Sequence, residues 1–230
     1  MSRDYPLLPW DPPQVQALRE KLQKPRAEED PEAFYLHRRF SIYLTLALAR
    51  RFPRLHPNHL TLLAVLLAFL APSVAAFLPK GGGLFLLFLA YHLVYTLDLV
   101  DGELARFTGK HSELGAWLDR LLAWGVHLLA LSAYLRLALP GTPWPLLGVS
   151  AYLFRWAVAE TRKGGPGAGG GGPALLRWLF APSGLVFAAL LAGLLNLNVW
   201  VLFLFPLAYS LIGLRNALAV LFRLAGQAGE

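Results

Sequence analysis

The sequence predicts an all-α polytopic membrane protein, with six transmembrane helices preceded by a cytoplasmic amphipathic interfacial helix. Hydrophobic residues make up 56% of the 230 residues and the mean hydropathy is +0.48, as expected for a protein with several membrane spans. Apolar stretches long enough to cross a bilayer follow one another from about residue 60 onward. Basic residues gather in alternate connections between these stretches, a pattern that sets orientation in a membrane.

The N-terminal part is polar before it becomes amphipathic. Residues 1–30 are rich in proline and charge, so we expect no cleavable signal peptide there but a partly ordered cytoplasmic extension with one short helix near 13–24. Residues 31–53 place apolar side chains such as Phe34 and Phe40 among arginines and a histidine. This pattern predicts a helix that lies on the cytoplasmic face of the bilayer.

The transmembrane domain is expected over residues 54–222, with a short cytoplasmic tail at 223–230. A window of ~19 residues predicts spans near 60–78, 82–104, 115–139, 143–161, 174–196 and 198–221. The second span is apolar only as far as Val100 and then carries charged residues toward the surface. The glycine-rich run at 164–173 predicts a flexible loop between the fourth and fifth spans.

The distribution of lysine and arginine predicts the orientation. Residues 1–58 hold ten of these 21 residues, whereas the alternate connections hold only Lys80 and Arg136. The positive-inside rule therefore places both termini and the charged run in the cytoplasm, and we expect a multi-pass protein of a bacterial or archaeal cytoplasmic membrane. The net charge of +7 suits anionic lipid heads and a nucleotide. No helix-turn-helix or zinc-finger pattern indicates nucleic acid.

Three carboxylates interrupt the apolar sequence around the end of the second span. Asp98 and Asp101 are three residues apart, so on a helix they share one face, about 4.5 Å apart along the axis. Asp119 lies near the start of the next span. If the two spans form a hairpin, Asp119 comes close to Asp98 and Asp101. Carboxylates near lipid depth are costly and mark functional sites. Three of them suit Mg2+, Mn2+ or Ca2+ rather than a thiolate metal, in a chain that has no cysteine.

Gly102 and Arg106 extend this charged face. Because Gly102 has no side chain, a ligand's phosphate can approach the backbone closely. Arg106 lies about one turn further and can pair with an anionic oxygen in bidentate fashion. The alternative is that the arginine reaches lipid phosphates, with the carboxylates as interfacial charges paired to Arg106 and Arg120.

The complete run reads Asp98-x2-Asp101-Gly102-x2-Ala105-Arg106-x8-Gly115-x3-Asp119. It resembles the signature of the CDP-alcohol phosphotransferase (CDP-alcohol phosphatidyltransferase) family, whose last position is one more aspartate after three residues. Seven of the eight fixed positions match. Pro57-Asn58-His59-Leu60-Thr61 also resembles the segment that opens the first span of the family, and Arg38-Arg39-Phe40-Ser41 resembles the branch that handles inositol phosphates. Members of the family transfer a substituted phosphate from a CDP-alcohol to an acceptor hydroxyl and release CMP.

The resemblance implies a role for each residue of the run. Asp98, Asp101 and Asp119 would be metal ligands for Mg2+ or Mn2+, with two metal sites in the intact signature and the second weakened here. The CDP moiety would be held by Asp101, Gly102, Ala105, Arg106 and Gly115. Family members also hold the acceptor's phosphate with basic residues in later spans, which here would be Arg155 and Arg215; snorkelling at the span ends is the alternative for both.

Ala123 stands at the eighth position, where the family has an aspartate held to be a ligand of the second metal and the general base. His127 lies eight residues after Asp119, about 12 Å along a helix axis, which is too far for an imidazole to reach the same cation. Glu103 is expected on a different face and Glu113 before the helix, so no substitute base is expected. An alanine in place of this aspartate fits one of two cases. Either the aspartate was replaced deliberately to trap a bound state, or the chain is a diverged member with weakened or altered activity.

The sequence therefore supports one main hypothesis and two alternatives. The first is a CDP-alcohol phosphotransferase of phospholipid head-group synthesis, with CDP-diacylglycerol as the expected donor and an impairment at Ala123. The alternatives are a non-catalytic membrane protein that binds a CDP-alcohol or lipid, and a cation transporter that uses the aspartates. The glycines and Arg106 of the run favour a nucleotide pocket over transport. The expected partners are a CDP-alcohol, an acceptor alcohol and membrane lipids, and the family also implies a homodimer, which small residues in the third and fourth spans would allow.

Overall fold

The computed structural model describes residues 4–26, 29, 31–138, 142–161 and 181–227. Within these residues the protein is entirely helical, which confirms the predicted class. The elements are α1 (Pro13–Leu22), a π-helical turn η1 (Ala33–His37), α2 (Arg38–Arg51), α3 (Pro57–Ala76), α4 (Lys80–Thr108), α5 (Glu113–Leu135), α6 (Trp144–Thr161), α8 (Pro182–Leu195) and α9 (Asn198–Gln227).

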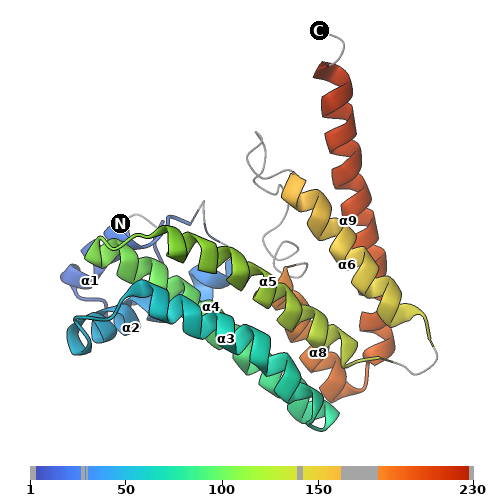
Figure 1. Ribbon diagram of the computed structural model, residues 1–230, viewed down its shortest axis with the longest axis horizontal. Coiled ribbons are helices and arrows are strands. Elements are labelled where there is room, and N and C mark those ends of the chain that lie inside the picture. Colours follow the sequence, from blue (N-terminus) through green and yellow to red (C-terminus); the bar gives the residue numbers. More distant parts are fainter. Residues whose placement is uncertain (1–3, 27–28, 30, 139–141, 162–180, 228–230) are drawn as a thin grey trace.

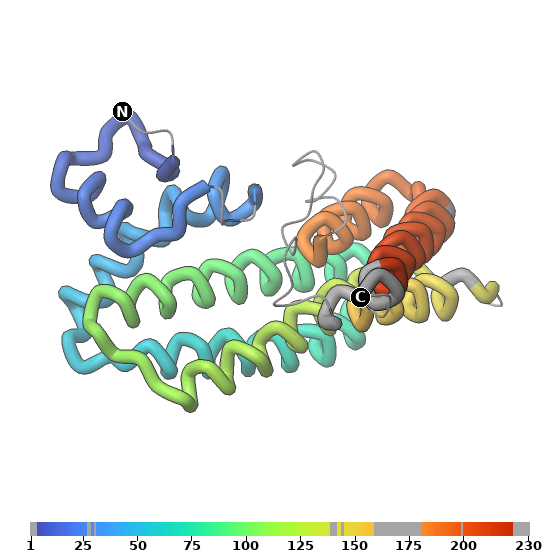
Figure 2. The backbone as a smooth tube through the Cα atoms, turned by 90° about the horizontal axis from the view of Figure 1, so that it is seen from above, coloured from blue at the N-terminus to red at the C-terminus, as the bar shows by residue number. Residues whose placement is uncertain are grey.

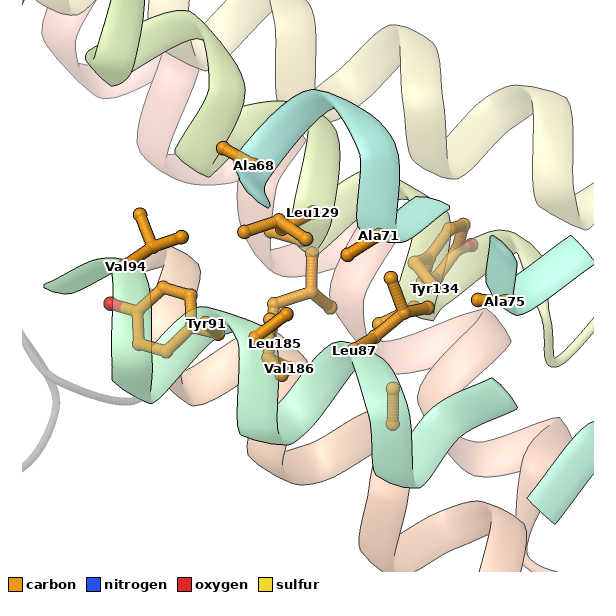
Figure 3. Packing of buried hydrophobic residues seen from close by; sticks show 14 of the residues in the cluster. Ala68, Ala71, Ala75, Leu87, Tyr91, Val94, Leu129, Tyr134, Leu185 and Val186 are labelled. Atoms are coloured by element: carbon orange, nitrogen blue, oxygen red, sulfur yellow. The ribbon is translucent and has the colours of Figure 1, made fainter. Parts of the chain in front are cut away.

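Helices α3, α4 and α5 form the centre of the fold, and α8 packs beside α4 and α5 (Figure 1). Helix α3 presents a row of buried alanines to its neighbours: Ala64, Ala68, Ala71 and Ala75. The last three are labelled in Figure 3. On α5, a Cβ added at Gly125 would lie 2.6 Å from Cβ of Ala68. Small residues at these positions let the helix backbones approach closely, which is how helices associate where lipid replaces water.

Local signals fix where the central helices begin and end. Helix α3 starts at Pro57, which suits the first turn of a helix, and His56 caps it. Helix α4 ends at Gly109, whose φ of +68° is the left-handed conformation that favours glycine at a helix end. The Ser112 side chain then caps α5 by accepting from the Gly115 amide. Because the turn between α4 and α5 is this short, the two helices run back along each other.

The apolar helices make this a multi-pass membrane protein. In the described part of the chain, four helices are long and apolar enough to cross a bilayer: α3, α4, α5 and the part of α9 from Trp200 to Phe222. Helix α8 has 14 residues, so it is about 21 Å long and shorter than the ~30 Å of hydrocarbon. Helix α6 has 18 residues and its sequence includes Arg155 and Glu160. Six spans therefore remain a prediction, and residues 174–180 of the expected fifth span lie outside the described residues.

Helices α1 and α2 lie at the end of the central bundle where α4 turns into α5 (Figures 1 and 2). The face of α2 that packs inward carries polar side chains, among them buried Ser41 and Thr45. Its outward side carries exposed Phe40 and Leu44. This arrangement is compatible with a helix that rests on lipid and binds its own protein through polar groups, although the interfacial location itself stays a prediction.

Candidate active site

The three aspartates predicted to act together meet at this end of the bundle. Asp98 and Asp101 come from α4 and Asp119 from α5, and one carboxylate oxygen of each lies within 4.8 Å of the others. The three-residue spacing on α4 and the short capped turn before α5 explain why they meet. Oxygen ligands gathered in this way match the donors that Mg2+ and Mn2+ prefer.

The aspartate cluster has basic neighbours only at a distance, Lys24 and Arg38 for Asp98 and Arg120 for Asp119. In the described part of the chain, no lysine, arginine or histidine forms an ion pair with Asp98, Asp101 or Asp119. The Thr61 hydroxyl donates to Oδ2 of Asp101 at 2.6 Å, a neutral contact. Two like charges about 4 Å apart repel by roughly 4 kcal/mol at an effective dielectric constant near 20. A divalent cation fits this cluster because it would remove that repulsion.

A cavity of about 320 Å³ opens beside the cluster. This volume is at the lower end of the range for small-molecule sites. Its lining includes the three aspartates and two further residues of the predicted run, Gly102 and Arg106. Sequence reasoning missed the rest of the lining, which is Lys24, Glu29, Arg38, Tyr95 and Leu99. The N-terminal extension therefore forms part of the wall, to which it adds a lysine and a glutamate.

Gly102 keeps space open between the cluster and Arg106. A Cβ at Gly102 would point toward the Arg106 guanidinium, whose nitrogens would lie 3.5 and 3.6 Å away. Nε of Arg106 donates to the backbone oxygen of Leu22 at 2.6 Å, so the extension also holds this arginine in place. The predicted approach of a phosphate at Gly102 is therefore sterically possible.

Gly115 lies in the contact between the starts of α3 and α5. A Cβ there would sit 3.0 Å from Oδ1 of Asn58 and 3.2 Å from Oγ of Ser112. Nδ2 of Asn58 in turn donates to Oγ of Ser112 at 2.9 Å. Neither Gly115 nor Ala105 is among the described residues that line the cavity. The structure thus gives Gly115 a packing reason to be glycine, and its predicted contact with CDP remains a prediction.

Ala123 is exposed one turn after the exposed Asp119 on α5. His127, the nearest imidazole further along this helix, has Nδ1 2.6 Å from the Tyr152 hydroxyl on α6. Helix α5 begins at Glu113, whereas the sequence placed this residue just before the helix; Glu113 is exposed and lies six residues before Asp119.

The two arginines predicted to hold an acceptor's phosphate lie on α6 and α9. The Arg155 guanidinium lies 5.5 Å from the Tyr209 ring centroid, and its Nε is buried without a hydrogen-bond partner. Nη2 of Arg215 donates to Oδ1 of the neighbouring Asn216 at 3.2 Å. Neither arginine is among the described residues that line the cavity.

Glu103 faces away from the cluster and holds α2 in place. Its fully buried carboxylate accepts hydrogen bonds from Arg38 Nη1 at 2.9 Å, Gln23 Nε2 at 2.8 Å, Ser41 Oγ at 2.5 Å and Thr45 Oγ1 at 2.7 Å. Burial alone would lower the pKa of Arg38, but its interactions with Glu29 and Glu103 outweigh burial and raise it. Arg38 therefore stays charged at the wall of the cavity, held in ion pairs with Glu29 and Glu103.

The sequence of the described site also matches a known family. Residues 54–221 match the family model described as CDP-alcohol phosphatidyltransferase. The chain belongs to the CDP-alcohol phosphatidyltransferase family. The resemblance predicted from the signature is confirmed, and with it a transferase of the CDP-alcohol phosphotransferase type in a membrane setting. The family is generally dependent on divalent metals, which the aspartate cluster can hold.

One curated relative is the bifunctional IPC transferase and DIPP synthase of Aquifex aeolicus (strain VF5). It is 37% identical over 98 residues, which cover 43% of this chain and 21% of the relative. The match therefore involves only about a fifth of that longer protein. No solved structure matches the chain.

Proposed function

We propose that this CDP-alcohol phosphotransferase uses the aspartate cluster to transfer a substituted phosphate from CDP-diacylglycerol to an acceptor alcohol, with release of CMP. The observation that carries the proposal is the cluster itself: three carboxylates from two helices within 4.8 Å, without a direct ion pair among the described residues and beside a cavity whose lining includes Lys24 and Arg106. Negative ligands for a cation next to positive ligands for phosphate are what a metal-bridged pyrophosphate requires.

Each group has a distinct task in this reaction. Asp98, Asp101 and Asp119 would hold Mg2+ or Mn2+, which when bound offsets the pyrophosphate charge and eases departure of CMP. Arg106 and Lys24 pair with phosphate oxygens, and Gly102 leaves room for them. The acceptor oxygen bonds to the phosphorus nearer the alcohol as the bond from that phosphorus to the CMP oxygen breaks. The acceptor proton must then pass to a base.

Position 123 is where that base would stand in the family signature. The methyl group of Ala123 accepts no proton and binds no metal, so we propose that the chain is impaired at proton removal and at the second metal. A positioned general base contributes roughly 10² to 10⁴ in rate. A chain without it retains the means to bind a CDP-alcohol, which keeps the non-catalytic binding protein as the second candidate function.

The acceptor subsite and the homodimer are further parts of the proposal. The buried, unpaired Nε of Arg155 supports a role for Arg155 in holding an acceptor's phosphate, and Arg215 is proposed to assist it. The homodimer rests on the family alone, because the small residues Ala130 and Gly148 are buried within one chain, where Gly148 packs against Tyr134. Crosslinking in native membranes tests the homodimer, which a monomer in bilayers would contradict.

The test of the reaction is CMP release by the purified full chain with Mg2+, CDP-diacylglycerol and a panel of acceptor alcohols. Ala123→Asp restores a carboxylate one turn after Asp119 and should raise CMP release at least ~10²-fold, the lower end of a general base's contribution. Ala123→Asn is the matched control, because asparagine has the size of aspartate but is not a base. This variant should not raise CMP release. Mg2+-dependent binding of CDP with no CMP release by Ala123→Asp would favour the non-catalytic alternative instead.

A further inference from the structure

A second group of convergent side chains lies outside the aspartate cluster, where η1 meets α4. Glu32 directly precedes η1, His37 ends it, and His92 belongs to α4. His37 Nε2 lies 3.3 Å from Glu32 Oε1, His92 Nδ1 lies 3.2 Å from His37 Nε2, and His92 Nδ1 lies 3.4 Å from Glu32 Oε1. His92 is six residues before Asp98, about 9 Å along the helix axis, so this triad is separate from the proposed reaction centre.

The edges of this triangle match one face of a zinc coordination tetrahedron. Zn2+ binds imidazole nitrogen at about 2.0–2.1 Å and carboxylate oxygen at about 2.0–2.2 Å, usually in tetrahedral geometry. Two ligands of a regular tetrahedron are about 1.63 bond lengths apart, which gives roughly 3.3–3.5 Å. All three observed edges lie at or near this range. They are longer than the ~2.9–3.0 Å typical of hydrogen bonds to nitrogen.

Proton positions also favour a cation between the three atoms. The Thr96 hydroxyl donates to the backbone oxygen of His92 at 2.7 Å, so its oxygen accepts from Nδ1 of His37 at 2.9 Å. In a neutral His37 imidazole this leaves the lone pair on Nε2, which faces Oε1 of Glu32. A proton on Nδ1 of His92 can form a good hydrogen bond to Nε2 of His37 or to Oε1 of Glu32, but not to both. The Thr96 contact resembles the outer hydrogen bond that orients a metal-binding histidine.

The backbone and the surroundings are also arranged for the triad. In a π-helical turn, hydrogen bonds join residues five apart, so η1 brings Glu32 and His37 to the same side. Their side chains are only 7% and 5% exposed, whereas His92 is 27% exposed and leaves an approach from outside. Among the described residues, Glu32 forms no ion pair with a lysine or arginine. This buried carboxylate has only imidazoles to offset its charge.

We propose that Glu32, His37 and His92 form a second metal site, selective for Zn2+ or a similar transition metal, with one coordination position open. Two imidazoles and a carboxylate are ligands that Zn2+ accepts, whereas Mg2+ prefers the all-oxygen aspartate cluster. The bound ion clamps the segment before α2 onto α4. It thereby fixes the N-terminal extension whose Lys24 and Glu29 line the cavity.

The experiment is a Zn2+ titration by calorimetry of the chelator-stripped full chain in nanodiscs, with excess Mg2+ to occupy the aspartate cluster. The wild type should bind one Zn2+. His92→Gln and His37→Gln should each weaken binding at least ~100-fold, and Thr96→Val about tenfold, as expected for an outer-sphere partner. His59→Gln, which removes an exposed imidazole of the His56–His59 pair, is the matched control and should bind like the wild type.

Two further measurements make the result decisive. Co2+ in place of Zn2+ should give the strong visible absorption of a four-coordinate ion in the wild type and not in His92→Gln. Zn2+ should also raise the unfolding temperature of the wild type but not of His92→Gln, because an ion that binds only the folded state stabilises it. Unchanged Zn2+ affinity in His92→Gln and Thr96→Val, or loss of binding only in His59→Gln, would overturn the proposal. His92 is partly exposed, so its variant remains testable even if His37→Gln fails to fold.

Discussion

Asp101 and Glu103 are two positions apart on α4 and are both buried, yet their surroundings are opposite. Glu103 accepts hydrogen bonds from four side chains, one of them a guanidinium. Asp101 accepts one hydrogen bond from Thr61 and faces Asp98 and Asp119. The same helix therefore carries on one side a carboxylate paired with a guanidinium and on the other a carboxylate with no such ion pair among the described residues.

This difference separates a structural carboxylate from a ligand-binding one. A buried charge is tolerated when its partners are built into the fold, and then it holds elements together. A group of like charges without partners raises the free energy of the folded protein, and a cation can offset that cost. The partners of a carboxylate thus indicate its role better than its burial does, since both residues are buried.

The largest expected effect is the loss of stability when Glu103 is removed. Glu103→Ala leaves Arg38 and three other buried donors facing an apolar methyl, and should cost about 3–5 kcal/mol in the free energy of unfolding. Asp101→Asn, in the absence of divalent metal, should leave stability unchanged or raise it, because one negative charge leaves the cluster. Denaturant unfolding of both variants in detergent measures the contrast. A similar loss of stability in both would refute it.

The second effect concerns binding of CDP to the aspartate cluster. Removal of divalent metal should weaken CDP binding by about 10²–10³-fold, the equivalent of one unscreened charge pair near 4 Å. Calorimetry with Mg2+ and with chelator measures this ratio. Glu103→Gln should keep the metal dependence, whereas Asp101→Asn should reduce it. Equal affinity for CDP in Mg2+ and in chelator would rule out a metal-bridged site.

Much of this comparison could be predicted from the sequence. The spacing of Asp98 and Asp101, with Asp119 after a short turn, predicted that the three would meet, because helix geometry and a hairpin leave little other choice. The different face of Glu103 followed from the same geometry. The helical class followed from apolar length and composition, and the family from the signature.

What the sequence did not predict depends on contacts between distant segments. Nothing in the sequence around Lys24 indicates that it lines a cavity beside Asp98, because packing of the extension on α4 places it there. The same is true of Gln23, whose amide reaches Glu103 across 80 positions of the chain. His37 and His92 are 55 positions apart, and no spacing in the sequence links them. Only the π-helical turn brings Glu32 to them.

A smaller effect is expected at Asp11, another satisfied carboxylate. Burial by itself would raise its pKa, but hydrogen bonds from Arg19, the Leu8 amide and Tyr43 outweigh burial and lower the pKa below the usual range. A lowered pKa in the folded state stabilises the fold above the unfolded pKa of about 3.9, and this contribution is lost as the pH falls through the folded value. Stability measured from pH 6 to 3 should therefore fall less steeply in Asp11→Asn than in the wild type. Identical slopes would contradict this.

The smallest effect is expected at His127, the imidazole closest along α5 to the position of the missing base. Its Nδ1 lies 2.6 Å from the Tyr152 hydroxyl, and its ring lies 4.9 Å from that of Trp156, so it is held in the contact between α5 and α6. In the Ala123→Asp background, His127→Gln should change CMP release by less than about threefold, far below the 10²-fold or more that loss of a general base costs. Asp119→Asn in the same background is the comparison that should abolish release. If His127→Gln abolished release while the protein remained folded and bound CDP, the imidazole would be the base and position 123 would not.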